Sequence, residues 1–362
     1  TLSMKFKRLF AAALIVIAAM PMAFASENVQ YVPGKNLTLI GKLMTTPDRY
    51  ARVDTLKYDG FTAYQRQYLN QTPAGLALVF TTDSREILLN FDYKKRMSGY
   101  NTNNIAFAGG DLYIRRDGKW LYAGSGVPSE EGKPVKLVAN MAPGEKECLL
   151  YLPLRSIIDE VYVGVDSGAK IAPAPNPFSR KVVFWGSSFT HGTSSNRPGM
   201  PYPLQFQRAT GLDVRSLGVS GNSKLQQSYA RVLADTEADA FVFDAFSNPK
   251  APEIRELFAE FVKTIRAKHP TTPLIFQQTI YRGGRNFNTA LDRSETEKMA
   301  AAEDVVRKAM ETDPNIYLIY PVADMDGTSC TDKTHPSDLG YYNWAESIRQ
   351  PILEILSRYP AK

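Results

Sequence analysis

A serine and a histidine that lie far apart in the chain are candidates for nucleophilic catalysis. Ser188 lies in the segment 181–192, where the apolar run Val-Val-Phe-Trp ends at a glycine and two serines follow. The run predicts a buried strand, and the serines suit a turn and the N-cap of a helix. A serine in that place can present its hydroxyl at the carboxyl edge of a parallel sheet, where ligands bind. An ordinary serine-rich helix cap has the same pattern.

A nucleophilic serine needs a general base, and the base needs a group that fixes its tautomer. The chain has only three histidines. His269 precedes a proline where a helix is expected to end, and His191 lies three residues after Ser188, at the expected start of a helix. His335 is therefore the best candidate base. Asp332 is close enough to share one short loop with His335, although aspartate before a helix is also a common cap. Other aspartates that could orient His335 are Asp324, Asp326 and Asp338.

Four sequence blocks carry a resemblance to a known enzyme family. They read Gly-Ser-Ser-Phe-Thr-His-Gly at 186–192, Ser-Leu-Gly-Val-Ser-Gly-Asn at 216–222, Asp-Ala-Phe-Ser-Asn at 244–248 and Asp-Lys-Thr-His at 332–335. In this order they resemble the blocks of the SGNH (GDSL-type) hydrolases, with Ser187 where many members have aspartate. Four ordered blocks are much more specific than any one of them.

Two further segments are similar to a subgroup of that family. Arg-Pro-Gly-Met at 197–200 follows the nucleophile turn, and Gly-Gly-Asp-Leu-Tyr at 109–113 is similar to the Gly-x-Asp-Leu-Tyr motif of an N-terminal domain. The resemblance therefore covers most of the chain after residue 25. Considered alone, the segment 109–113 is a glycine bend that opens a strand whose Leu112 packs inward.

The resemblance implies a catalytic triad of Ser188, His335 and Asp332. It also implies an oxyanion hole made of the Ser188 N–H, the Gly221 N–H and the side-chain amide of Asn248. Such donors stabilise the charge that develops on the ester oxygen when serine attacks. Taken singly, Gly221 is typical of a tight turn and Asn248 of an Asn-Pro turn. Some relatives work with a dyad, so Asp332 is less secure than His335.

Four residues near these blocks are candidates for contacts with substrate. His191 stands where relatives often have glutamine, and support for the turn is an equal interpretation. Arg197 and Tyr202 follow the nucleophile turn, where a loop packed over the first helix explains them equally well. Arg282 follows the fourth expected strand of the second domain and could bind an anionic or hydroxyl-rich ligand at the active edge.

The pattern of strands and helices predicts two domains. Residues 26–170 indicate an all-β sandwich, jelly-roll-like, because short strand-like runs alternate with turn signals. Residues 171–180 contain three prolines and predict a stiff connector. In residues 181–362 strands and helices alternate, which predicts a parallel sheet between helix layers, an α/β/α domain. The family resemblance adds a flavodoxin-like strand order.

The expected elements are defined by short ranges. Strands are expected at 76–81, 86–91, 112–115, 119–122 and 160–164 in the first domain and at 182–185, 214–217, 241–245, 274–278 and 316–319 in the second. Helices are expected at 203–210, 224–234, 252–268, 294–312 and 337–358. Pro351 should kink or divide the last of these helices.

Residues 1–25 predict a cleavable signal peptide. A basic start at Lys5, Lys7 and Arg8 precedes an apolar core at 9–19 and the small-residue site Ala-Phe-Ala at 23–25. The apolar run is too short for a membrane span. No cysteine follows the cleavage site, so a lipid anchor is not expected. We therefore expect a periplasmic or secreted enzyme.

Charge and cysteine content narrow the function further. Three of the 43 basic residues lie in the leader, which leaves 40 against 37 acidic residues and gives no sign of a nucleic-acid-binding face. Cys148 and Cys330 could form a disulfide after export, but two buried or semi-buried thiols are favoured. No histidine or cysteine spacing indicates a metal, and no cofactor is expected.

These observations together predict a serine esterase that acts on short acyl esters, with acetyl groups on carbohydrate as the first expectation. An acyltransferase that uses the same triad is one alternative. A protein that binds carbohydrate without catalysis is the other. The expected partner is a small-molecule or glycan ester, and the oligomeric state is left open.

Overall fold

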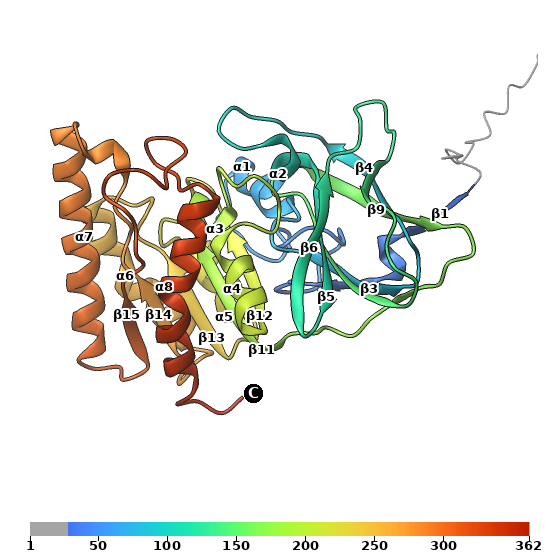
Figure 1. Cartoon of the computed structure of the whole chain (residues 1–362). Helices are drawn as coiled ribbons and strands as arrows, with labels where there is room; N and C mark the ends of the chain where they lie inside the picture. The colour runs from blue at the N-terminus through green and yellow to red at the C-terminus, as the bar shows by residue number, and fades with distance from the viewer. Residues whose placement is uncertain (1–27, 362) are drawn as a thin grey trace, which may run out of the picture.

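The computed structural model describes residues 28–361 and contains three β-sheets. Two antiparallel sheets come first in the chain, and a parallel sheet flanked by helices follows, as Figure 1 shows. The expected signal peptide at 1–25 lies outside the described residues. In the part of the chain that is described, no helix is both long and apolar enough to span a bilayer.

The N-terminal domain is a sandwich of two antiparallel sheets. Their strand orders are β1-β9-β4-β7 and β10-β3-β8-β5-β6, with β2 paired to β3. Leu78, Leu89, Leu150 and Val163 come from both sheets and are buried in one core between them. The strands are β1 Val29–Pro33, β2 Thr38–Ile40, β3 Ala77–Thr82, β4 Ile87–Lys95, β5 Gly110–Arg116, β6 Lys119–Gly126, β7 Val135–Val138, β8 Lys146–Tyr151, β9 Ile157–Asp166 and β10 Ile171–Pro173.

The second domain has the strand order β12-β11-β13-β14-β15, and all of its neighbouring strands are parallel. The first strand of this domain, β11, therefore lies between its second and third strands, β12 and β13, which is the flavodoxin-like order. The predicted fold class is thus confirmed. The strands are β11 Ser179–Gly186, β12 Leu212–Gly218, β13 Ala240–Asp244, β14 Leu274–Gln277 and β15 Ile316–Ile319.

Helices cover both faces of the parallel sheet. Helix α6 shows why: Ile254, Phe258, Phe261 and Ile265 recur at helical spacing and are buried against one face, with residues of α5 and α7. Residues of α3, α4 and α8 pack on the other face. The helices are α3 Ser188–His191, α4 Tyr202–Thr210, α5 Gln227–Ala234, α6 Ala251–Arg266, η3 Gly283–Arg285, α7 Thr289–Met310 and α8 Asp338–Leu356.

Three details differ from the expected elements. Helix α7 begins at Thr289, before the expected start, because the Asn288 side chain accepts a hydrogen bond from the Leu291 N–H and caps it. Helix α8 continues through Pro351, so the expected division does not occur. Strand β10 lies inside the expected connector and extends the second sheet as an edge strand, the place where a sheet tolerates proline.

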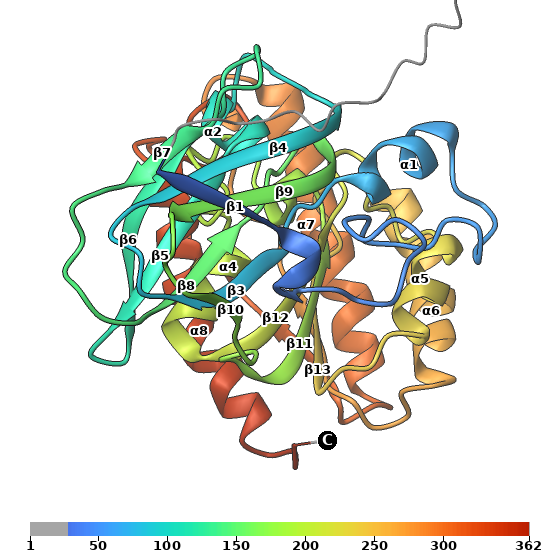
Figure 2. The same ribbon diagram turned by 90° about the vertical axis from the view of Figure 1, so that its right-hand side faces the viewer.

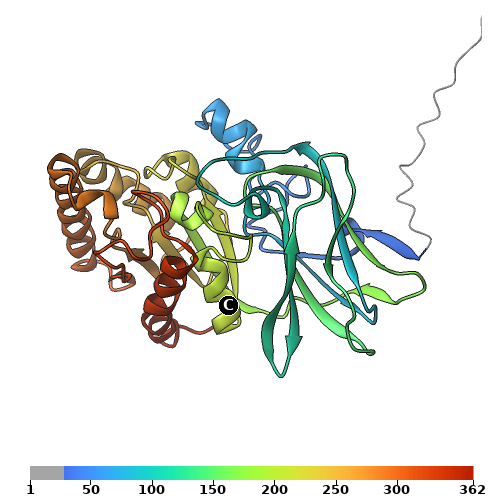
Figure 3. The same cartoon turned by 45° about the horizontal axis from the view of Figure 1, so that its top comes forward.

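One part of the N-terminal half packs with the second domain. After β2 the chain leaves the sandwich and forms α1 Ala63–Gln67, η2 Leu69–Gln71 and, later, α2 Asn104–Ala108, while η1 Gly34–Asn36 joins β1 to β2. Tyr58, Phe61 and Leu69 are buried in the same hydrophobic core as Trp185 and Tyr229. Figures 2 and 3 show α1 projecting from the sandwich towards the side of the second domain that carries α5. The two domains therefore share a core, which fixes the sandwich beside the sheet edge.

Candidate active site

The turn after β11 fixes the position of Ser188. The Ser187 side chain caps α3 by accepting from the Phe189 N–H at 3.1 Å, and both the N–H and the hydroxyl of Ser187 donate to Asp244 Oδ2, at 2.9 and 2.6 Å. A Cβ on Gly186 would lie 2.2 Å from Thr190 Oγ1, so only glycine fits where the strand ends. These constraints hold Ser188 at the carboxyl edge of the sheet, at the first turn of a helix.

The structure brings together the three residues of the expected triad. Ser188 Oγ lies 2.8 Å from His335 Nε2, and His335 Nδ1 lies 2.9 Å from Asp332 Oδ2. Asp332 Oδ1 also accepts from the Thr334 and His335 N–H groups, at 2.7 and 2.6 Å. The loop between Asp332 and His335 is therefore closed by its own hydrogen bonds. It presents the imidazole edge-on to the serine, as a general base requires.

The charge states in this group suit that role. Burial lowers the pKa of His335 below its ordinary 6.5, although the hydrogen bond to Asp332 acts in the opposite direction. Burial raises the pKa of Asp332, but hydrogen bonds, above all those from His335, outweigh it and set the value to about 2. At neutral pH the imidazole is thus neutral and free to accept a proton, and the carboxylate is ionised.

Gly221 and Asn248 line the same cavity as Ser188. Gly221 has a φ of +71°, a conformation in which glycine is favoured. Asn248 Oδ1 accepts from the N–H and the hydroxyl of Ser223, both at 3.1 Å, which fixes which way the amide faces. Within residues 28–361 no protein acceptor binds Asn248 Nδ2, so that N–H₂ group can donate to a ligand.

The cavity at Ser188 has a volume of about 780 Å³ and is built by both domains. The second domain supplies the nucleophile side. The N-terminal domain supplies a wall that contains several aromatic and polar side chains, namely Tyr64, Tyr68, Lys95, Tyr100, Asn101, Phe107 and Arg155. Asn101 also reaches the triad, since its Nδ2 donates to Asp332 Oδ2 at 3.0 Å. No motif in the sequence marks Asn101 or Arg155, because both act across the domain junction.

Two of the side chains expected to contact substrate, those of His191 and Tyr202, are buried instead. His191 is 1% exposed, and its ring bonds the Leu154 carbonyl at 2.8 Å and the Ser220 hydroxyl at 3.1 Å. Burial holds its pKa well below 6.5, so it supports the loop before Gly221 as a neutral ring. Tyr202 is fully buried and stacks on Trp344 with ring centroids 4.4 Å apart. Neither side chain lines the cavity.

The two expected arginine contacts are also engaged elsewhere. Arg197 Nε donates to Asp111 Oδ1 at 3.1 Å, and its Nη2 donates to the Tyr113 hydroxyl at 3.1 Å. Asp111 is the aspartate of the Gly-Gly-Asp-Leu-Tyr segment, so this pair joins the two domains. Arg282 donates to the Ser247 carbonyl and lies over the Phe189 ring at 5.3 Å. Both arginines brace the walls of the site and do not line the cavity.

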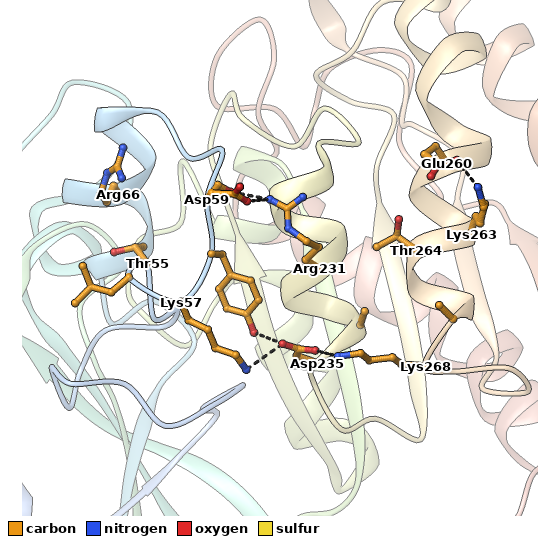
Figure 4. Close-up of a pocket in the computed structure, with 14 residues that line it drawn as sticks. Thr55, Lys57, Asp59, Arg66, Arg231, Asp235, Glu260, Lys263, Thr264 and Lys268 are labelled. Atoms are coloured by element: carbon orange, nitrogen blue, oxygen red, sulfur yellow. Dashed lines mark hydrogen bonds and ion pairs between the residues drawn. The ribbon is translucent and has the colours of Figure 1, made fainter.

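A larger cavity, of about 960 Å³, lies between residues 55–59 and helices α5 and α6 (Figure 4). Most of its charged side chains pair with one another: Lys57 lies 2.9 Å from Asp235, which also binds Lys268, and Arg231 binds Asp59. No serine, cysteine or histidine lines this cavity. The serine–histidine pair lies in the smaller cavity, which contains Ser188 and His335.

The two cysteines and the acidic residues offer no other reactive centre in the described chain. Cys148 and Cys330 are free thiols, the arrangement that the sequence favours over a disulfide. Burial raises the pKa of Cys148 to about 12, so its thiol is unreactive at neutral pH. Among residues 28–361 no group of three or more histidine, cysteine or acidic side chains is arranged to hold a metal.

Comparisons with known proteins agree with the order of the two domains. The profile of the GDSL-like Lipase/Acylhydrolase family matches residues 179–354, and the profile of GxDLY, the N-terminus of SGNH-hydrolase-type esterases, matches residues 29–171. The search of curated proteins gave no match.

Solved structures are similar over nearly the whole chain. A protein from Bacteroides ovatus ATCC 8483, described as a GDSL-like lipase, is 39% identical with a TM-score of 0.86, over 92% of this chain and 100% of its own. The salicylyl-acyltransferase SsfX3 of a tetracycline biosynthetic pathway is 21% identical with a TM-score of 0.65, over 92% and 99%. A family two carbohydrate esterase from Cellvibrio japonicus is 13% identical with a TM-score of 0.58, over 91% and 98%. The last two show a shared fold alone.

With both profiles matched in order and 39% identity over the full length of a relative, the chain belongs to the SGNH (GDSL-like lipase/acylhydrolase) family of carboxylic ester hydrolases, in the group with an N-terminal GxDLY domain.

Proposed function

We propose that the protein is an exported serine esterase that removes short acyl groups, in the first place acetyl groups, from carbohydrate. The observation that carries the proposal is the 2.8 Å distance between Ser188 Oγ and His335 Nε2, with Asp332 on the other ring nitrogen. This is the geometry of an activated serine nucleophile.

In the proposed reaction Ser188 Oγ attacks the ester carbonyl carbon while His335 Nε2 takes the hydroxyl proton. Asp332 holds the Nδ1–H and stabilises the imidazolium that forms. The developing oxyanion accepts hydrogen bonds from the Ser188 N–H, the Gly221 N–H and Asn248 Nδ2. Each such donor contributes about 3–4 kcal/mol to transition-state stabilisation.

The second half of the reaction uses the same groups. His335 gives its proton to the oxygen of the departing alcohol, which leaves an acyl-enzyme on Ser188. A water molecule then takes the place of the alcohol, and His335 removes its proton as it attacks the acyl carbon. Breakdown of the second tetrahedral intermediate releases the carboxylic acid and returns the proton to Ser188.

Carbohydrate as the alcohol is supported by two observations. The cavity is wide, at about 780 Å³, and carries tyrosines, which stack well on sugar rings. A carbohydrate esterase is among the proteins with the same fold. Export rests on the leader-like residues 1–25. The fold neighbour SsfX3 is an acyltransferase, and an alcohol that replaced water in the second step would give acyl transfer here too.

The decisive experiment compares Ser188→Ala with the unaltered enzyme on 4-nitrophenyl acetate. The variant should lose at least about 10⁴-fold in kcat/KM, as other serine hydrolases do. Ser294→Ala, an exposed serine on α7, is the matched control and should keep full activity. Retention of activity by Ser188→Ala would remove the proposed nucleophile.

The finer parts of the proposal need separate measurements. Acetyl, butyryl and octanoyl esters of aryl and sugar alcohols should show highest kcat/KM for acetyl on sugar. Product analysis with an added sugar acceptor separates hydrolysis from transfer, since transfer gives a new sugar ester. Export predicts that the protein recovered from the cell envelope or medium starts after Ala25.

A further inference from the structure

The cavity at Ser188 contains a buried positive charge that has no acidic partner. Arg155 lines the cavity together with Ser188 and His335 and is 8% exposed. Its Nη2 donates to Thr193 Oγ1, and the Thr193 N–H donates to the Ser188 carbonyl at 3.0 Å. Arg155 is therefore linked to Ser188 through one intervening residue, Thr193. No carboxylate in the described chain forms an ion pair with it.

The surroundings of Arg155 do not neutralise this charge. Its electrostatic neighbours are the hydroxyl groups of Tyr64, Tyr68 and Tyr341, which are neutral at physiological pH. Arg52 also lies nearby, and it is fully buried with Nε and Nη1 unpaired. Two guanidinium groups thus share this region. Guanidinium stays protonated in proteins, and a buried charge without a partner is costly.

The rest of the cavity wall has the same sign. Lys95 is exposed and lines the cavity at its N-terminal-domain side, and no aspartate or glutamate lines it among residues 28–361. The carboxylate of the triad, Asp332, already accepts hydrogen bonds from His335, Thr334 and Asn101. An incoming ligand therefore meets cationic groups whose charge is not balanced by the protein.

We propose that the enzyme acts on esters that carry a carboxylate, and that Arg155 binds this carboxylate while Lys95 attracts it at the rim. The inference rests on the proposed esterase function and narrows its substrate class. A guanidinium matches a carboxylate with two parallel N–H···O bonds, which an ammonium cannot do. The carboxylate can belong to the alcohol, as in a uronic acid, or to the acyl group, as in a succinyl half-ester.

The test uses two pairs of substrates that differ in one charge. Acetylated methyl glucuronoside is compared with acetylated methyl glucoside, and a succinyl sugar ester is compared with a butyryl sugar ester. In each case the rate at which the carboxylic acid is released is measured. In one pair the unaltered enzyme should have a higher kcat/KM for the acidic member by about tenfold or more. The pair that shows the preference identifies which part of the substrate carries the carboxylate.

Variants then assign the preference to residues. Arg155→Gln should lower the acidic-to-neutral ratio of kcat/KM by about 10- to 100-fold, mainly through KM, because a charge-assisted hydrogen bond is lost. Lys95→Gln should lower it less. Lys268→Gln, in the remote cavity between residues 55–59 and helices α5 and α6, is the matched control and should leave the ratio unchanged. If Arg155→Gln does not fold, Lys95→Gln and the salt dependence of the unaltered enzyme carry the test, since added salt should weaken only the acidic member.

The outcomes separate this inference from the esterase proposal. Equal kcat/KM within both pairs, or an equal loss for acidic and neutral esters in Arg155→Gln, would overturn the carboxylate assignment and leave the esterase intact. An equal loss for acidic and neutral esters in Arg155→Gln would mean that Arg155 stabilises the oxyanion or the structure of the cavity wall. Failure of the unaltered enzyme to hydrolyse 4-nitrophenyl acetate and every ester in the two pairs would refute the esterase proposal itself.

Discussion

Replacement of Asn101 by alanine tests whether the N-terminal domain takes part in catalysis. Asn101 lies outside the second domain, yet its Nδ2 donates to Asp332 Oδ2 at 3.0 Å, the same oxygen that His335 Nδ1 binds at 2.9 Å. Without the amide, this oxygen keeps only its bond to the imidazole. The carboxylate is then less firmly held in the plane of the ring, and the histidine less well aimed at Ser188.

The size of the effect follows from the exposure of Asp332. A hydrogen bond to a charged group contributes about 1.5–3 kcal/mol. The Asp332 side chain is 27% exposed, so water can replace part of what is lost. The remaining Oδ1 bonds from the Thr334 and His335 N–H groups are unaffected. We therefore expect a loss of about 1 kcal/mol, or about fivefold in rate.

The assay is steady-state hydrolysis of 4-nitrophenyl acetate by the full chain. Asn101→Ala should lower kcat about fivefold and leave KM nearly unchanged, because Asn101 acts on the base and not on substrate. Asn104→Ala changes an exposed asparagine of the same segment and is the matched control. Unaltered kcat in a folded Asn101→Ala protein would refute the reasoning, and so would an equal loss in Asn104→Ala.

Two further predictions concern the base and the oxyanion hole. Because burial holds the pKa of His335 below 6.5 and only the neutral ring accepts a proton, kcat/KM should rise with pH with a midpoint below 6.5 and then level off; a midpoint above 7 would contradict this. Gly221 and Gly118 both have positive φ, +71° and +76°, with nothing within 4 Å of an added Cβ. Alanine at either should cost about 1–2 kcal/mol of unfolding free energy, but only Gly221→Ala should also lower kcat. Because alanine keeps the N–H, the loss of kcat would come from displacement of that N–H by the strained backbone, and equal kcat in the two variants would contradict this.

The residues that meet at Ser188 in the second domain could be predicted from sequence because each lies in a short local pattern. Ser188 follows an apolar strand directly, and Asp332 and His335 share one loop, so each piece has its own signal. The strand order, however, came from the family resemblance. The helices were placed within a few residues except where a cap intervened, as at Asn288. Pro351 did not divide α8, since one missing N–H does not end a helix that is packed along its length.

The wall of the site contributed by the N-terminal domain could not be predicted in the same way. Asn101 and Arg155 lie in segments with no motif, and their partners lie in the second domain: Asn101 binds Asp332, 231 positions away, and Arg155 binds Thr193, 38 positions away. For His191 and Tyr202, burial favours the structural interpretation over the equally weighted contact with substrate. Both are close to Ser188 in sequence, but His191, at the end of α3, and Tyr202, at the start of α4, are buried in the interior. Closeness to Ser188 in sequence therefore does not place a side chain in the cavity, and residues distant in sequence, such as Asn101 and Arg155, can line it.

The Gly-Gly-Asp-Leu-Tyr segment explains how two domains can share one site. Asp111 is fully buried and accepts from Arg197 Nε at 3.1 Å and from the Gly199 N–H at 2.9 Å. A Cβ on Gly199 would lie 2.7 Å from Asp111 Oδ2, so the contact requires glycine. The loop that follows the nucleophile is thus bound to strand β5 of the sandwich. The proposed base, His335, would need such a fixed junction if Asn101 aligns it through Asp332, because a shift of 1 Å at a reacting group is enough to slow catalysis.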